Sequence, residues 1–194
     1  MKKKKIAVFA SGGGSGLQAI IDGCKEGKIN AVVDMVISNN SKSKALQRAR
    51  DANIAAFHFS SKTHPCGLDD AILATLAAHE IDIIFLAGYL KKVGENILDA
   101  YKGWIFNIHP SLLPKYGGVG MHGVRVHQAV IDAGDANTGA TIHRVDTGYD
   151  TGEIVSQVTV PVEKGDTAET LSARVLKQEH VLLVETLAAI CRIP

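Results

Sequence analysis

The sequence places an asparagine and a histidine two residues apart, Asn107 and His109, at the end of a short apolar run. Alternation along an extended strand directs both side chains to the same face. An amide beside an imidazole suits acyl transfer, because the amide can stabilise a developing oxyanion and the imidazole can carry a proton near neutral pH. A lone histidine in a strand is more often structural, but the paired asparagine and the strand-end position favour a catalytic role.

A second candidate site is the glycine-rich segment that follows the first apolar run. Backbone N–H groups in such a segment can close on an anion, and the start of the next helix adds partial positive charge. Leu17 and Gln18 occupy the positions at which the dinucleotide and Walker fingerprints require glycine or lysine. A small phosphomonoester is therefore favoured, with a ligand-free tight turn as the alternative. The candidate residues are Gly12, Gly13, Gly14, Ser15 and Gly16.

Alternating strand and helix patterns precede and surround these residues. Strands are expected at residues 6–10, 32–37, 55–59, 81–86 and 105–109, and helices at 17–24, 45–52 and 69–79. Strands that are apolar on both faces and separated by helices predict a parallel, doubly wound sheet. Ligands bind at the carboxyl ends of the strands of such sheets, where both candidate sites lie.

The alternation of strand and helix patterns ends after Pro110. A glycine-rich loop at residues 115–123 leads to an expected helix at 124–133. Two β-rich runs, 140–145 and 154–160, are joined by a turn at 148–152 and predict an antiparallel pair at one edge of the sheet. A long final helix is expected at 167–193, with Asp166 or Thr167 as N-cap. We predict one α/β domain over residues 1–194: a doubly wound, mostly parallel sheet with a C-terminal antiparallel extension and a long final helix.

Composition narrows the class of protein. Of 194 residues, 46% are hydrophobic and 21% charged, which predicts a packed core. The net charge of +1 gives no general attraction to nucleic acid or to anionic membranes, and no stretch approaches about 20 apolar residues. Three scattered cysteines favour a reducing cytosol. His122 and His127 are five residues apart and no H-E-x-x-H occurs, while His58 and His64 flank a loop without acidic partners, so no metal is expected.

Six segments together resemble the phosphoribosylglycinamide formyltransferase family, in the family's order and over nearly the whole chain. The Asn-x-His and Ser-Leu-Leu-Pro core is shared by all folate-dependent formyl-transfer enzymes, whereas the combination is specific. The segments are Ala10-Ser-Gly-Gly-Gly-Ser-Gly-Leu-Gln18, Leu86-Ala-Gly-Tyr-Leu90, Asn107 to Lys115, Gly139-Ala-Thr-Ile-His143, Tyr149-Asp-Thr-Gly152 and Gln178-Glu-His180.

The resemblance implies a Rossmann-like formyltransferase fold, 10-formyltetrahydrofolate as formyl donor and 5′-phosphoribosylglycinamide as acceptor in purine (IMP) biosynthesis. It implies that residues 1–100 form the phosphate- and acceptor-binding half and residues 101–194 the catalytic and folate-binding half. The 12–16 loop would hold the acceptor phosphate, and Glu179 the ribose hydroxyls. The expected folate wall consists of Leu86, Ala87, Gly88, Tyr89 and Leu90.

Asn107, His109 and Asp150 match the family's catalytic trio, and His143 matches a histidine that orients the aspartate. The resemblance implies direct transfer, without a covalent acyl-enzyme and without a metal. From the residues alone, Asp150 between two glycines is equally consistent with a plain turn residue. Gly16 departs from the family, which usually has asparagine at this position.

Three alternatives remain open. A 10-formyltetrahydrofolate hydrolase would share the core but usually carries an N-terminal regulatory domain. A transferase acting on initiator methionyl-tRNA carries a C-terminal nucleic-acid-binding domain. A non-catalytic phosphate-ligand binding module could use the same fold, but it would have no use for the full trio. We expect a cytoplasmic monomer or homodimer that binds small-molecule substrates, and neither nucleic acid nor membrane.

Overall fold

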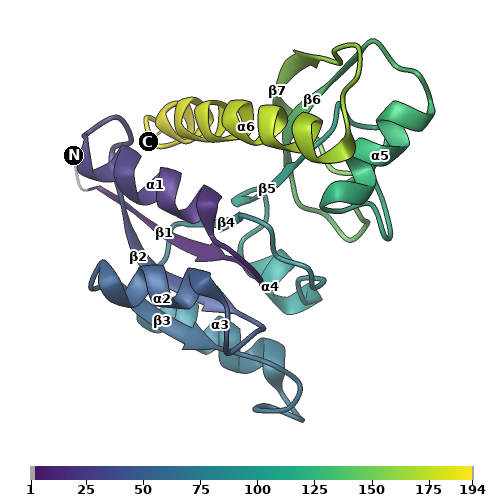
Figure 1. The fold of residues 1–194 in the computed structure, drawn as a ribbon. Helices are drawn as coiled ribbons and strands as arrows, with labels where there is room; N and C mark the ends of the chain where they lie inside the picture. Colours follow the sequence, from purple (N-terminus) through teal and green to yellow (C-terminus); the bar gives the residue numbers. More distant parts are fainter. Residues whose placement is uncertain (1–2, 194) are drawn as a thin grey trace.

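The computed structural model describes residues 3–193, and within that range the chain forms one seven-stranded sheet and six helices (Figure 1). The strands and helices agree closely with the elements expected from periodicity. In chain order they are β1 (Lys4–Phe9), α1 (Ser15–Lys25), β2 (Ala31–Ser38), α2 (Lys44–Asp51), β3 (Ala55–His58), α3 (Leu68–Ala78), β4 (Ile83–Leu86), α4 (Glu95–Ala100), β5 (Ile105–His109), α5 (Val124–Asp132), β6 (Asn137–Arg144), β7 (Ile154–Pro161) and α6 (Ala168–Ile190).

The strand order is β3-β2-β1-β4-β5-β6-β7. Strands β1 to β5 pair in parallel, and β6 and β7 add antiparallel neighbours, so the predicted fold class is confirmed. The register aligns Leu86 of β4 with Asn107 of β5, and Asn107 with His143 of β6. Three residues distant in sequence are thereby brought to one level of the sheet.

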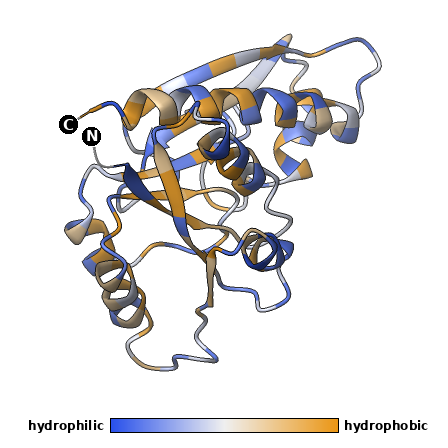
Figure 2. Cartoon of the chain, turned by 90° about the vertical axis from the view of Figure 1, so that its left-hand side faces the viewer, coloured by the Kyte–Doolittle hydropathy of each residue, from blue (hydrophilic) through white to orange (hydrophobic). Residues whose placement is uncertain are grey.

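Helices cover both faces of the sheet (Figures 1 and 2). Apolar residues of α1, α2, α5 and α6 join one buried cluster with one face of the strands. Residues of α3 and α4 join a second cluster on the other face. In α1, the buried residues Leu17, Ile20 and Ile21 fall at helical spacing, which is why this segment is a helix with one face on the sheet.

Two details differ from the sequence expectations. Helix α4 was not expected, because six residues are too few to show a helical period. Strand β4 begins at Ile83 rather than at Ile81, because the Ile81 N–H donates to the carbonyl of Leu76 at the end of α3. Helix α6 begins as predicted, with Thr167 as N-cap accepting a hydrogen bond from the Thr170 N–H, and ends at Ile190.

Gly139 has no room for a side chain. A Cβ at this position would lie 1.9 Å from the Val158 carbonyl oxygen on β7 and 2.7 Å from a methyl carbon of Leu112. We expect Gly139→Ala to lower the free energy of unfolding by about 2–4 kcal/mol. Urea unfolding would measure the loss, with Gly13→Ala as control, because a Cβ there meets nothing within 4 Å. Equal stability of the two variants would contradict the steric argument.

Candidate active site

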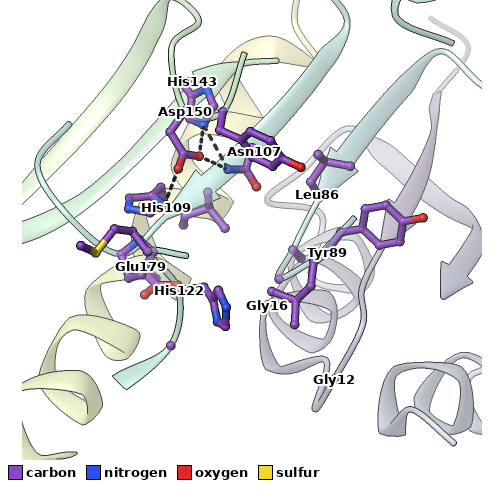
Figure 3. A pocket seen from close by; sticks show the side chains of 18 of the residues that line it. Gly12, Gly16, Leu86, Tyr89, Asn107, His109, His122, His143, Asp150 and Glu179 are labelled. Carbon is purple, nitrogen blue, oxygen red and sulfur yellow. Dashed lines mark hydrogen bonds and ion pairs between the residues drawn. The ribbon is translucent and has the colours of Figure 1, made fainter. Parts of the chain in front are cut away.

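A cavity of about 560 Å³ opens at the carboxyl ends of β1, β4 and β5 (Figure 3). It lies where the chain order of the sheet reverses between β1 and β4, the position at which doubly wound sheets bind ligands. The structure brings all the residues singled out in the sequence to this one cavity: the 12–16 loop, the 86–90 segment, Asn107, His109, His143, Asp150 and Glu179.

Helix α2 donates hydrogen bonds to backbone carbonyls of the glycine loop. The Ala45 N–H donates to the Gly12 carbonyl oxygen (3.1 Å), and Arg48 Nε donates to the Gly13 carbonyl oxygen (3.0 Å). Gly14 has φ 71°, and a Cβ there would lie 2.9 Å from Ala45, so both backbone conformation and space require glycine. With these carbonyls engaged, the free N–H groups at the start of α1 are the polar groups offered to an anion.

Ser11, which the sequence reasoning did not single out, joins the glycine loop to the segment after β4. Its N–H donates to the Gly88 carbonyl oxygen (3.0 Å), and its hydroxyl oxygen accepts from the Leu90 N–H (2.8 Å). The two loops also meet at Gly16, where a Cβ would lie 3.3 Å from Ala87 Cβ and 3.5 Å from a methyl carbon of Leu183. This close approach gives a packing reason for glycine at position 16.

Asn107 and His143 form a hydrogen-bonded pair across β5 and β6. The Nδ1–H of His143 donates to the Arg144 carbonyl oxygen (2.8 Å), which leaves Nε2 as an acceptor. The Asn107 amide nitrogen donates to that Nε2 (3.0 Å). The backbone carbonyl thus fixes the tautomer of His143, and His143 in turn fixes which way the Asn107 amide points.

Asp150 lies at the centre of the polar groups in the cavity (Figure 3). One carboxylate oxygen accepts from the Gly118 N–H (2.9 Å) and lies 3.4 Å from His109 Nδ1. The other accepts from the Asn107 amide (3.4 Å) and lies 3.4 Å from His143 Nε2. The residue adopts φ 57°, an uncommon conformation for a non-glycine residue. These contacts are more than a plain turn residue requires.

The pKa values of Asp150 and His109 are shifted by their surroundings and by each other. Burial alone would raise the pKa of Asp150, but a hydrogen bond from His143 in its protonated form, the Gly118 N–H and the charge of protonated His109 together lower it below its ordinary value. Burial lowers the pKa of His109, against the opposing effect of the Asp150 carboxylate. At neutral pH the unliganded site therefore holds a carboxylate beside a largely neutral imidazole, ready to receive a proton.

His109 uses its two ring nitrogens differently. Nε2 lies 2.8 Å from the Tyr116 carbonyl oxygen, to which it donates, and Nδ1 faces Asp150. A neutral imidazole carries only one N–H, so Nδ1 is the free base in this arrangement. A proton gained during a reaction would reside on Nδ1, between the carboxylate and the cavity.

Helix α6 forms a wall of the cavity through residues at helical spacing. Glu179 lies on this wall, and burial raises its pKa to about 7. The sequence analysis singled out the segment Gln178-Glu-His180 on this helix and gave a binding role to Glu179 alone. The spacing of three or four residues was the available signal for the other lining residues, which are Ser172, Leu176, His180 and Leu183.

The raised pKa of Glu179 makes stability depend on pH. The folded protein holds the Glu179 proton more tightly than the unfolded chain, in which glutamate titrates near 4.5. The contribution of this proton to the free energy of unfolding is therefore fully present below pH 4.5 and is lost as the pH rises through 7. We expect the free energy of unfolding to fall by about 2 kcal/mol between pH 5 and 7.5 through this group.

Urea unfolding of Glu179→Gln over the same pH range should lack this decrease. Glu185→Gln changes an exposed glutamate of the same helix and is the matched control. A wild-type pH profile identical to that of Glu179→Gln would refute the assignment.

Two features are absent from residues 3–193, a metal-binding cluster and a membrane-spanning helix. No group of three or more His, Cys, Asp or Glu side chains in that range is arranged to hold a metal ion. Within the same range, no helix has the length and apolar character required to cross a bilayer.

The formyl transferase family model matches residues 4–187. A Vigna unguiculata protein named phosphoribosylglycinamide formyltransferase, chloroplastic, is 46% identical over 98% of this chain, which spans 62% of that relative's length. The phosphoribosylglycinamide formyltransferase of Bacillus subtilis (strain 168) is 38% identical, with 91% of this chain and 89% of that protein covered. The crystal structure of glycinamide ribonucleotide transformylase 1 from Symbiobacterium toebii gives a TM-score of 0.92 at 37% identity, covering 98% of this chain and 89% of that one.

The match to the family model over most of its length shows that the chain belongs to the formyl transferase family. The resemblance to phosphoribosylglycinamide formyltransferases that the sequence motifs predicted is confirmed. The relatives that it matches over most of both chains are phosphoribosylglycinamide formyltransferases.

Proposed function

We propose that this protein transfers a formyl group from 10-formyltetrahydrofolate to the amine of 5′-phosphoribosylglycinamide, a step of de novo purine biosynthesis. The observation that carries the proposal is the convergence of an amide, an imidazole and a carboxylate, Asn107, His109 and Asp150, on the cavity that the glycine loop also lines. A protein that only binds a phosphate ligand has no use for this trio.

The acceptor would lie between α1 and α6. Its phosphate would accept hydrogen bonds from the N–H groups of the 12–16 loop at the start of α1. Glu179 lines the same cavity from α6, where its carboxylate can accept from the ribose hydroxyls. Hydrogen bonds to the ionised carboxylate would lower its raised pKa, so acceptor binding would release a proton below pH 7.

The donor would occupy the other part of the cavity, along residues 86–90. This wall fits a flat, largely apolar ring system with polar edges, because it combines apolar side chains with backbone groups at Ala87 and Gly88. Leu90, Val119 and Tyr149 are exposed apolar residues that also line the cavity. The folate supplies the formyl group that is to be transferred.

The chain's residues would act on the reacting atoms without forming a covalent bond. The Asn107 amide, by giving up its longer bond to Asp150 (3.4 Å), and His109, once Nδ1 has gained a proton, would stabilise the oxyanion that develops on the formyl oxygen. Asp150 would stabilise the charge on His109 and help to move a proton from the attacking amine toward the leaving nitrogen, directly or through water. His143 would act as a positioning residue, because it holds the amide of Asn107 and contacts Asp150.

The same proposal covers the organisation of the chain. Residues 1–100 would bind mainly the acceptor phosphate, and residues 101–194 would supply the catalytic groups and most of the folate site. Both halves would form one domain, a proposal supported by the packing of α6 against α1 beside the shared cavity. The partners would be small molecules, and three free cysteines agree with a reducing cytosol.

The deciding experiment follows the release of tetrahydrofolate from 10-formyltetrahydrofolate, with and without 5′-phosphoribosylglycinamide. The proposal requires release that depends on the acceptor, with stoichiometric formation of the formylated product. Release without acceptor would instead indicate a hydrolase. No release under either condition would indicate a binding protein or a different acceptor.

A further inference from the structure

A carboxylate outside the cavity holds two consecutive side chains of the loop that follows β5. Asp135, just after α5, accepts hydrogen bonds from Lys115 Nζ (2.9 and 3.1 Å) and from the Tyr116 hydroxyl (2.9 Å). We call these three residues the Asp135 clamp. None of them lines the cavity at the strand ends, so the proposed chemistry does not use them directly.

The clamp acts on a residue with an uncommon backbone conformation. Tyr116 has φ 56°, in the left-handed region that disfavours side chains other than glycine. Its carbonyl oxygen accepts the hydrogen bond from His109 Nε2 (2.8 Å). Ser111 holds the neighbouring peptide through a hydrogen bond to the Lys115 carbonyl oxygen (2.6 Å). On the other side, the Gly118 N–H donates to Asp150 (2.9 Å), and between these two bonds the Tyr116 side chain anchors the peptide group that faces His109.

Two acceptors compete for the single N–H of neutral His109. The Tyr116 carbonyl favours the proton on Nε2, whereas the Asp150 carboxylate, 3.4 Å from Nδ1, favours it on Nδ1. His127 and His143 also face His109 but are not hydrogen-bonded to its ring. The balance thus depends on how firmly the Tyr116 carbonyl is held.

We propose that Asp135 is a positioning residue for the site: by clamping Tyr116, it keeps the proton of neutral His109 on Nε2 and leaves Nδ1 as the free base beside Asp150. The consequence for catalysis rests on the proposed function, because transfer requires a base at Nδ1. The consequence for the tautomer does not, because it concerns the unliganded protein alone.

The test is side-chain ¹⁵N NMR of the histidines in Asp135→Asn and in Tyr116→Phe, with His109 assigned by its loss in His109→Asn. We expect the Nδ1–H fraction of neutral His109 to rise about threefold or more in both variants. Acceptor-dependent kcat/KM should fall about tenfold, mainly through kcat. Asp132→Asn removes a charge three residues away, from an exposed carboxylate that accepts from Gln128 Nε2 (2.7 Å), and is the matched control.

An unchanged His109 tautomer in Tyr116→Phe, which deletes one hydroxyl group, would overturn the proposal even if activity fell. A similar tautomer shift in Asp132→Asn would also overturn it, because a general charge effect would then suffice. Should Asp135→Asn fail to fold, Tyr116→Phe decides the question alone. Should the wild-type protein transfer no formyl group, the proposed function fails, while the NMR comparison still decides whether the clamp sets the tautomer.

Discussion

Asp150→Asn should lower kcat for formyl transfer about a thousandfold while leaving the affinity for the acceptor within about twofold. The side chain keeps its shape, and its remaining oxygen can still accept from the Gly118 N–H. It loses the negative charge that stabilises a proton on His109 Nδ1, 3.4 Å away. Acceptor affinity is expected to persist, because the groups proposed to bind the acceptor phosphate and ribose are the 12–16 loop and Glu179, and not Asp150.

Steady-state kinetics and calorimetric titration of the acceptor would measure the two quantities on the same preparation. Asp51→Asn is the matched control, since it removes one exposed carboxylate that accepts from Gln47 Nε2 (2.7 Å). The pKa of His109 should fall further in Asp150→Asn, because the carboxylate raises it in the wild type. A variant with full activity would remove Asp150 from the mechanism.

Asn107→Ala should lower kcat/KM by about 10²- to 10³-fold, because it removes the amide donor from the position where the oxyanion would form. It also leaves Nε2 of buried His143 without the amide that donates to it, so a loss of stability of about 1–3 kcal/mol should accompany the kinetic effect. Kinetics well below the unfolding temperature separate the two effects.

Asn30→Ala, at an exposed position before β2, controls for the loss of an amide side chain. The double variant Asn107→Ala with Asp150→Asn should lose less activity than the product of the single losses, since the two groups act on the same reacting atoms. Independent, fully multiplicative losses would mean that Asn107 and Asp150 do not share one site.

The sequence was sufficient for much of the fold, because the strands of the parallel sheet are continuous apolar runs interrupted by helices. It also identified Asn107 and His109 together, since strand alternation alone places them on one face. Asp150 was different. The residues allowed a turn or a catalytic role equally, and only the pairing of β5 with β6 brings its carboxylate to His109. Contacts of that kind depend on long-range register, which local patterns do not contain.

The Asp135 clamp likewise could not be predicted from local sequence patterns. Lys115, Tyr116 and Asp135 look like ordinary loop residues, and their link to His109 passes through a backbone carbonyl. Short helix α4 was missed for a simpler reason, since six residues do not complete two turns. Glu179 needed the family resemblance, because a glutamate on a helix is usually solvated and its burial depends on the helices and loops that surround it.

The packing of α6 on α1 has a consequence for how the protein becomes competent to bind. Residues 15–25 and 168–190 are separated by most of the chain, yet they form two walls of one cavity. The contacts between α1 and α6 join residues that are very far apart in the sequence, so forming them closes a long loop at a high cost in entropy. We therefore expect these contacts to form late in folding. During synthesis, α1 would wait with its apolar face uncovered until α6 leaves the ribosome. Substrate affinity would therefore report completion of folding, and ligand added during refolding should accelerate no step before the docking of α6.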